Sequence, residues 1–227
     1  MALFGIADLH LSLGTQKSMD IFRGWENYVE RLEQNWRMLV KPEDVVVVAG
    51  DISWAMKLEE TRQDFEFLNS LPGNKLLLKG NHDYWWGTRK KMEEFFSACG
   101  FDTLHILFNN AVRVGDFAVC GTRGWFFDDD GDRTVLLREA GRLQASIQEA
   151  KKLGGEPVVF LHYPPVCGGT VCDEIFEILA DQQIRRCYYG HLHGPAIRRA
   201  VTGNYKGMCW IKCRIPCRAS QTTTAIC

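Results

Sequence analysis

Five short apolar segments of this 227-residue chain each end in residue types that bind metals. The segments are strand-like, and Asp, His or Asn follows each of them within a few residues; they are 2–7, 45–49, 75–79, 157–161 and 185–189. In an open α/β sheet, ligands bind outside the carboxyl ends of the strands. We therefore expect the polar side chains after these segments to share one edge of the fold.

The residues after these five segments form a mixed set of oxygen and imidazole donors. They are Asp8 and His10, Asp51, Asn81, His82 and Asp83, His162, and His191 with His193. Five of the six histidines lie in these positions, and only His105 does not. Such donors suit Mn, Fe or Zn better than Ca or Mg alone. Each motif by itself also fits a turn with surface histidines, but a shared metal site explains all five together.

Strand-like and helix-like stretches alternate along the chain, which predicts an α/β domain with mixed sheets. Apolar periodicity near 3.6 residues and helix-stop signals predict helices at about 20–39, 57–70, 88–99, 133–152 and 172–182. Shorter strands are expected at 103–108, 111–115, 117–121, 196–201 and 205–215. Hairpin turns are expected at Asn109-Asn110, Gly115-Asp116 and Gly203-Asn204.

Composition narrows the class of protein. The formal net charge is -1, which argues against nonspecific nucleic-acid binding because that needs a basic face. No apolar run approaches the roughly 20 residues that span a bilayer. The N-terminal residues MALFGIADLH resemble a strand rather than a signal peptide, so a cytoplasmic location is expected. Nine scattered cysteines do not suggest a disulfide framework.

The ordered set D-x-H, G-D, G-N-H-D, H and G-H-x-H resembles the calcineurin-like metallophosphoesterase superfamily, and in particular its bacterial predicted phosphohydrolases. The resemblance runs from Asp8 to His193, and every motif is filled. It implies a sandwich of two mixed β-sheets flanked by helices, in four α/β/β/α layers. We expect a single domain over residues 1–217, followed by a frayed tail over residues 218–227.

The resemblance also implies a role for each motif residue. Asp8, His10 and His193 would hold a first metal ion. Asn81, His162 and His191 would hold a second, and Asp51 would bridge both. His82 would face the substrate phosphate and the leaving oxygen without binding metal. Asp83 would orient His82 and favour its charged form; the alternative is that Asp83 caps the helix that follows.

The function implied is a metal-dependent phosphohydrolase. It would cleave a small phosphomonoester or phosphodiester through a dinuclear centre and a metal-bound hydroxide, with two ions drawn from Mn, Fe and Zn. One alternative is a nuclease or nucleotide phosphodiesterase of the same fold; a nucleotide substrate stays possible, whereas nucleic acid is disfavoured by the lack of a basic groove. A non-catalytic metal-binding scaffold is disfavoured because all ligands and His82 are present. The substrate and the oligomeric state stay open.

Two further stretches allow more than one interpretation. Tyr84, Trp85 and Trp86 either line a substrate pocket or pack in the core, and we favour packing. Cys209, Cys213 and Cys217 recur every four residues, a spacing that fits neither zinc nor iron–sulfur motifs. The simplest explanation is a half-buried final strand, and the role of the cysteine-rich segment 209–227 stays open.

Overall fold

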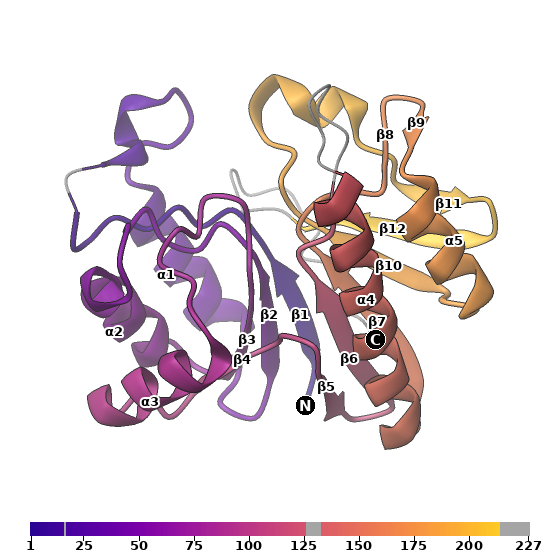
Figure 1. The fold of residues 1–227 in the computed structure, drawn as a ribbon. Coiled ribbons are helices and arrows are strands. Elements are labelled where there is room, and N and C mark those ends of the chain that lie inside the picture. Colours follow the sequence, from indigo (N-terminus) through magenta and orange to yellow (C-terminus); the bar gives the residue numbers. More distant parts are fainter. Residues whose placement is uncertain (16, 126–132, 214–227) are drawn as a thin grey trace. The chain divides into compact units, whose positions relative to one another are not determined.

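The structure is a computed structural model that describes residues 1–15, 17–125 and 133–213. Within these residues the chain divides into two units. The first, here called the N-terminal unit, spans Met1–Ile106, and the second, the C-terminal unit, spans Leu107–Cys213. The expected tail over residues 218–227 lies outside the described residues. The α/β class expected from the alternation of elements is confirmed (Figure 1).

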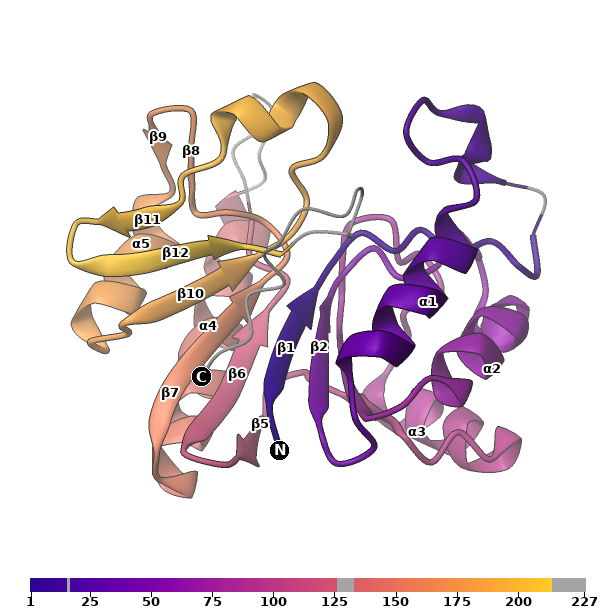
Figure 2. The same cartoon turned by 180° about the vertical axis from the view of Figure 1, so that it is seen from behind.

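The N-terminal unit is built on a four-stranded sheet in the order β1-β2-β3-β4. The strands are β1 (Leu3–Ile6), β2 (Val45–Ala49), β3 (Asn74–Leu78) and β4 (Leu104–Ile106). Helices connect them: η1 (Met19–Ile21) and α1 (Tyr28–Leu39), then η2 (Leu58–Thr61) and α2 (Arg62–Ser70), then α3 (Arg89–Cys99). Figure 2 shows α1, α2 and α3 on the same face of this sheet.

All three strand pairs of this sheet are parallel, whereas two mixed sheets were expected. The reason is that a helical crossover lies between each strand and the next, and such crossovers return the chain in the same direction. β4 pairs with β3, so Asn109-Asn110 is not a hairpin turn. The first long helix begins at Tyr28 rather than at residue 20, because Asn27 has a left-handed φ of 51° that interrupts the helical path.

The C-terminal unit has a six-stranded mixed sheet in the order β11-β12-β10-β7-β6-β5. Its strands are β5 (Ala111–Val114), β6 (Phe117–Thr122), β7 (Glu156–Leu161), β10 (Arg186–Tyr189), β11 (Gly203–Tyr205) and β12 (Met208–Lys212). The outer pairs β5–β6 and β11–β12 are antiparallel, and the inner pairs are parallel. Helix α4 (Arg133–Leu153) packs on β5 and β6, and α5 (Asp173–Asp181) packs on α4.

Smaller elements complete this unit. A hairpin of β8 (Val166–Cys167) and β9 (Thr170–Val171) precedes α5, and the 3-10 helix η3 (Gly194–Arg199) precedes β11, where a strand was expected over residues 196–201. The β11–β12 turn lies at Lys206-Gly207 rather than at Gly203-Asn204. Both turn residues have positive φ, 50° and 81°, which is what the favoured two-residue hairpin turn requires.

Burial follows the character of each strand. All five residues of β2 are buried, as a strand covered on both faces requires. β12 is half buried as expected, with Met208 and Trp210 inside and Cys209 exposed. Cys217 and Cys227 lie outside the described residues. Over residues 1–15, 17–125 and 133–213, no helix combines the length and the apolar character needed to cross a bilayer.

Candidate metal centre

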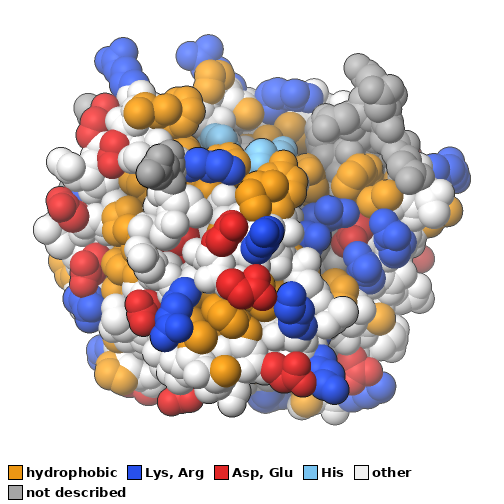
Figure 3. Space-filling view, turned by 60° about the vertical axis from the view of Figure 1, so that its left-hand side comes forward, with side chains coloured by type: hydrophobic (Ala, Val, Ile, Leu, Met, Phe, Trp, Pro, Cys, Tyr) orange, Lys and Arg blue, Asp and Glu red, His pale blue; other side chains and the backbone are white. Residues whose placement is uncertain are grey.

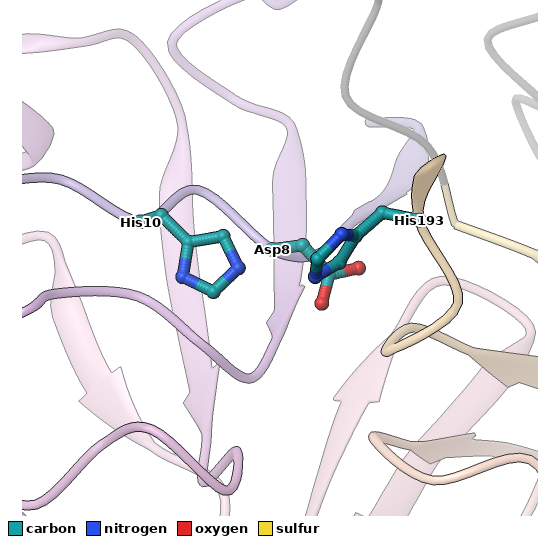
Figure 4. Close-up of side chains that lie close together, drawn as sticks. All are labelled: Asp8, His10 and His193. Atoms are coloured by element: carbon teal, nitrogen blue, oxygen red, sulfur yellow. The ribbon is translucent and has the colours of Figure 1, made fainter. Parts of the chain in front are cut away.

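Asp8 and His10 lie in the segment that leaves β1, and both are buried. Their backbone N–H groups donate to the carbonyls of Gly50 and Asp51, at 3.0 and 2.9 Å, so the segment runs beside the exit of β2. Both residues have left-handed backbones, with φ of 57° and 47°. Figure 4 labels these two side chains together with His193 of the C-terminal unit.

Asp51 follows β2 and is buried next to other predicted site residues. One carboxylate oxygen accepts a hydrogen bond of 2.8 Å from the backbone N–H of His82, and the other lies 3.8 Å from His10 Nε2. Only glycine fits at position 80, because a Cβ there would lie 2.1 Å from Asp51 Oδ1. The turns after β1, β2 and β3 therefore bring Asp51, His10 and the His82 backbone together within the N-terminal unit.

The carboxylate of Asp83 is fully buried and joins the turn after β3 to the turn after β2. Its Oδ2 accepts hydrogen bonds from the N–H groups of Gly80 and Asp51, at 2.6 and 2.9 Å. Its Oδ1 accepts from the Ile52 N–H at 2.8 Å and from Trp85 Nε1 at 3.1 Å. Asp83 thus holds the backbone that carries the predicted bridging ligand.

These contacts differ from both roles expected for Asp83. Its hydrogen bonds go to backbone and indole N–H groups, and His82 Nδ1 is buried without a hydrogen-bond partner. Nor does Asp83 cap the following helix, because the N-cap of α3 is Thr88, whose side chain accepts from the Lys91 N–H. The reason is that the carboxylate is already enclosed by donors from two turns, a geometry that only the tertiary fold creates.

Aromatic rings surround His82 in the N-terminal unit. The ring of Trp54 lies 4.8 Å away between centroids, that of His10 5.8 Å and that of Tyr84 6.1 Å. Tyr84 is exposed, whereas Trp85 is buried in the core, so packing is confirmed for Trp85 and not for Tyr84. Trp54 was not singled out from the sequence; its only signal is its place three residues after Asp51.

In the C-terminal unit, His162 and His191 lie together at the ends of β7 and β10. Their ring centroids are 5.2 Å apart, and the ring of Tyr163 lies 4.4 Å from that of His191. His162 is buried, and its backbone N–H donates to the Arg123 carbonyl at 3.1 Å. His191 has a left-handed φ of 68°. Two predicted imidazole ligands are therefore neighbours within this unit.

The remaining predicted ligands are less enclosed. Asn81 is half buried, and a hydrogen bond from its backbone N–H lowers the pKa of Asp51. His193 is exposed and forms the N-cap of η3. Figure 3 shows histidine side chains reaching the surface among hydrophobic side chains. Several residues have the donor type and the position to take part in holding a metal ion; they include Asp8, His10, Asp51, His162 and His193.

Two neighbouring carboxylates of the N-terminal unit, Asp51 and Asp83, are buried. Burial raises the pKa of Asp51, although the backbone N–H of His82 opposes this shift. Burial, and next the charge of Asp51, raise the pKa of Asp83. Burial thus makes both carboxylates costly to ionise, and the charge of Asp51 adds to the cost at Asp83. A metal ion at Asp51 would offset that cost, because its charge is the largest local one in such a site.

Backbone strain is concentrated at the predicted ligands. Among the described non-glycine residues, the positive φ angles belong to Asp8, His10, Asn27, Asp51, Asn109, Gln183, His191 and Lys206. Half of these positions are ones that the sequence predicted as metal ligands. Left-handed non-glycine residues are uncommon, and such strain clusters at functional sites. The folded chain therefore holds Asp8, His10, Asp51 and His191 in conformations that local preference disfavours.

Comparison with known proteins places the chain in a family. The model of the calcineurin-like phosphoesterase family matches residues 1–195. The chain belongs to the calcineurin-like phosphoesterase family. The match contains every predicted ligand and both Asp83 and His82, so the resemblance found in the motifs is confirmed at the level of the family. A comparison with curated proteins gives no match.

Two solved structures are similar to this calcineurin-like phosphoesterase at low sequence identity. Phosphopantetheinyl hydrolase from Mycobacterium tuberculosis has a TM-score of 0.56 and 14% identity, over 94% of this chain and 88% of that chain. A protein of unknown function from Aquifex aeolicus has a TM-score of 0.47 and 16% identity, over 94% and 90% of the two chains. At such identities, the likeness to the hydrolase concerns the fold alone.

Proposed function

We propose that this protein is a metal-dependent phosphoesterase whose two units each supply ligands to a pair of transition-metal ions. The observation that carries the proposal is the left-handed backbone at four predicted ligands, Asp8, His10, Asp51 and His191. Left-handed backbones are uncommon outside glycine and cluster at functional sites, and a metal site needs donors in fixed orientations.

The donor set fits such ions. Asp8 and His10 from the N-terminal unit would hold one ion with His193, while Asn81 would hold the other with His162 and His191. Asp51 would take part in holding both, since a carboxylate offers two oxygen donors. Carboxylate, amide and imidazole donors of this kind suit Mn, Fe or Zn. Membership of a phosphoesterase family agrees with this set.

A pair of bound metal ions supplies charge neutralisation for a phosphoryl group and lowers the pKa of bound water. The remaining chemistry belongs to the chain. His82 is tied to Asp51 through its own backbone N–H at 2.8 Å, while its ring nitrogen Nδ1 has no hydrogen-bond partner in the protein. Its imidazole would donate a proton to the leaving oxygen, an effect of roughly 10²–10⁴-fold in rate.

The proposed substrate is a small phosphomonoester or phosphodiester. Phosphoryl transfer depends on positioning and charge neutralisation rather than on a protein nucleophile. The buried carboxylates and imidazoles would hold the metal ions that neutralise this charge, and no covalent step needs to be assumed. The net charge of -1 agrees with a small substrate better than with a nucleic acid, whose binding depends on many cationic contacts.

Metal binding tests the proposal first. Purified protein is dialysed against Mn²⁺, and metal is counted by elemental analysis; we expect two ions per chain. Asp51→Asn and His162→Ala, one from each unit, should each lower that number. His105→Ala is the matched control, because His105 is exposed in β4 and its ring contacts Asn74 rather than any predicted ligand. Unchanged binding in both site variants would contradict a shared centre.

Turnover tests the reaction class. The Mn-loaded protein is assayed with p-nitrophenyl phosphate and bis(p-nitrophenyl) phosphate, with and without chelator. We expect hydrolysis of at least one ester, abolished by chelation. His82→Ala should retain both metal ions but lose about 10²-fold or more in kcat on the ethyl ester of the same phosphate class, whose leaving oxygen needs a proton. Undiminished hydrolysis after complete metal removal would refute the proposed function, and an unchanged rate on the ethyl ester in His82→Ala would remove His82 from the reaction.

A further inference from the structure

We propose that Trp54 is a positioning residue that holds the His82 imidazole in place for leaving-group protonation, an inference that rests on the proposed phosphoesterase function. A catalytic histidine is often oriented by a hydrogen-bonded carboxylate, and Asp83 is the neighbour expected to do this. In this protein both oxygens of Asp83 are occupied by backbone and indole donors. The His82 ring must therefore be held in another way.

Ring contacts provide the alternative. Among the described residues, Trp54 has the ring centroid nearest to that of His82, at 4.8 Å, with an interplanar angle of 50°. The rings of His10 and Tyr84 are farther away, and Tyr84 is exposed, with 56% of its surface accessible. His82 Nδ1 is buried and has no hydrogen-bond partner. Packing against the indole is thus the closest constraint on the orientation of this imidazole.

Trp54 is itself well anchored. Its backbone N–H donates to the Leu11 carbonyl at 2.8 Å, next to the bridge between Leu11 and Ser53. Its ring stacks on the predicted ligand His10 at 4.9 Å and 19°, and Lys17 Nζ lies 5.8 Å from the ring centroid. The indole Nε1 is buried without a hydrogen-bond partner, so ring contacts rather than a side-chain hydrogen bond fix the indole.

The consequence for the reaction is specific to the leaving group. During hydrolysis a water oxygen forms the new bond to phosphorus and releases its proton to solvent. The bond from phosphorus to the leaving oxygen breaks, its electron pair stays on that oxygen, and the oxygen takes a proton from His82. Solvent then returns a proton to His82. A strongly basic alkoxide needs this proton, whereas a nitrophenolate leaves without it.

The test compares Trp54→Leu with Trp54→Phe. Both are assayed on a p-nitrophenyl ester and on the ethyl ester of the same phosphate class, chosen as the class that the wild-type protein hydrolyses. A misplaced catalytic group costs about 10²-fold. We therefore expect Trp54→Leu to lower kcat by about that factor for the ethyl ester only, with KM unchanged. Trp54→Phe keeps an aromatic ring and should restore most of the loss.

A matched control separates positioning from general destabilisation. Trp36→Phe removes an equally large indole from α1, where Nε1 donates to the Pro72 carbonyl at 2.9 Å. This variant should lower stability while leaving the ratio of the two rates unchanged. Equal losses on both esters in Trp54→Leu, or a Trp54→Phe variant as impaired as Trp54→Leu, would overturn the positioning role.

A second measurement is independent of turnover. In metal-free protein with ¹³C-labelled histidine, the order parameter of the His82 Cε1–H bond is measured by NMR. Rigid groups give values near 0.85 and flexible ones below about 0.6. We expect a fall in Trp54→Leu and none in Trp54→Phe; an unchanged value in Trp54→Leu would refute the inference. If wild-type protein binds no metal and hydrolyses neither ester, the proposed function fails, and this measurement alone decides the role of Trp54.

Discussion

Each unit contains a buried carboxylate that supports the backbone near a predicted ligand, Asp83 in the N-terminal unit and Glu139 in the C-terminal unit, but the two are stabilised differently. In the N-terminal unit, the hydrogen bonds of Asp83 come from backbone N–H groups and one indole. In the C-terminal unit, Glu139 accepts from Thr122 Oγ1 and Arg142 Nη1, both at 2.6 Å, and lies 3.5 Å from Arg123 Nη2. One carboxylate is held by neutral dipoles and the other by guanidinium groups.

The difference shows what each carboxylate supports. Asp83 binds the N–H of Asp51 directly, so it shapes the turn that carries the predicted bridging ligand. Glu139 acts indirectly, because it pairs with the guanidinium of Arg123. The Arg123 carbonyl in turn accepts hydrogen bonds from the N–H groups of His162 and Tyr163, at 3.1 and 2.9 Å. Neutral donors leave room for a cation nearby, whereas a guanidinium partner satisfies the charge within the unit. We therefore expect the N-terminal unit to depend more on its carboxylate.

The largest expected effect is that of Asp83→Asn. An amide in this position turns one acceptor into a donor that faces at least two N–H groups. Leaving buried groups unsatisfied costs about 1–3 kcal/mol each, so we expect the free energy of unfolding to fall by about 3 kcal/mol or more. Urea denaturation of the metal-free protein measures it. Asp102→Asn, an exposed position in the same unit, should change stability by no more than about 0.5 kcal/mol.

A second test uses a buried lysine of the same unit. Lys75 is fully buried, and its Nζ donates to the Leu71 carbonyl and to Thr103 Oγ1. Burial, and next the charge of Arg37, lower the pKa of Lys75 from 10.5 to about 8. Between these values the unfolded chain binds a proton that the folded chain does not. Stability should therefore rise with pH from about 8 to 10.5, by up to about 3 kcal/mol.

Substitution identifies the source of this pH dependence. Lys75→Met keeps the length of the side chain and removes the titrating group, so the rise between pH 8 and 10.5 should disappear from urea denaturation curves. Lys90→Met is the control, because Lys90 is 85% exposed on α3 and should leave the rise intact. A rise that persists in Lys75→Met would assign the effect to other groups and weaken the view of Lys75 as a buried neutral amine.

Much of the candidate site could be predicted from the sequence because its residues lie at strand ends. Buried strands are recognisable as apolar runs, and the chain order then gives Asp8, Asp51 and His162 similar positions at the ends of their strands. The partners of Asp83 could not be predicted. They depend on how the turns after β2 and β3 meet in space. From the sequence alone, a carboxylate next to a histidine suggests a contact between Asp83 and His82 instead.

Trp54 and the assignment of β4 show the same limit. Trp54 stands in a short irregular segment, where periodicity gives no orientation for a side chain, and its contacts with His10 and His82 arise from three different loops. β4 is short enough that local turn signals suggested a hairpin with β5, whereas its actual partner is β3, about 30 residues earlier. Both features are decided by tertiary pairing rather than by local preference.

The smallest expected effect is that of Glu139→Gln, and it tests the comparison directly. Glutamine still accepts one hydrogen bond, and both guanidinium groups keep some access to solvent, with 17% and 32% of their side chains exposed. We expect a loss of about 2 kcal/mol in urea denaturation, less than for Asp83→Asn. Glu149→Gln, an exposed pair with Lys152 on the same helix, is the control and should change stability by about 0.5 kcal/mol or less. A loss as large as that of Asp83→Asn would contradict the comparison. It would show that the two buried carboxylates contribute equally to stability, whether guanidinium groups or backbone dipoles hold them.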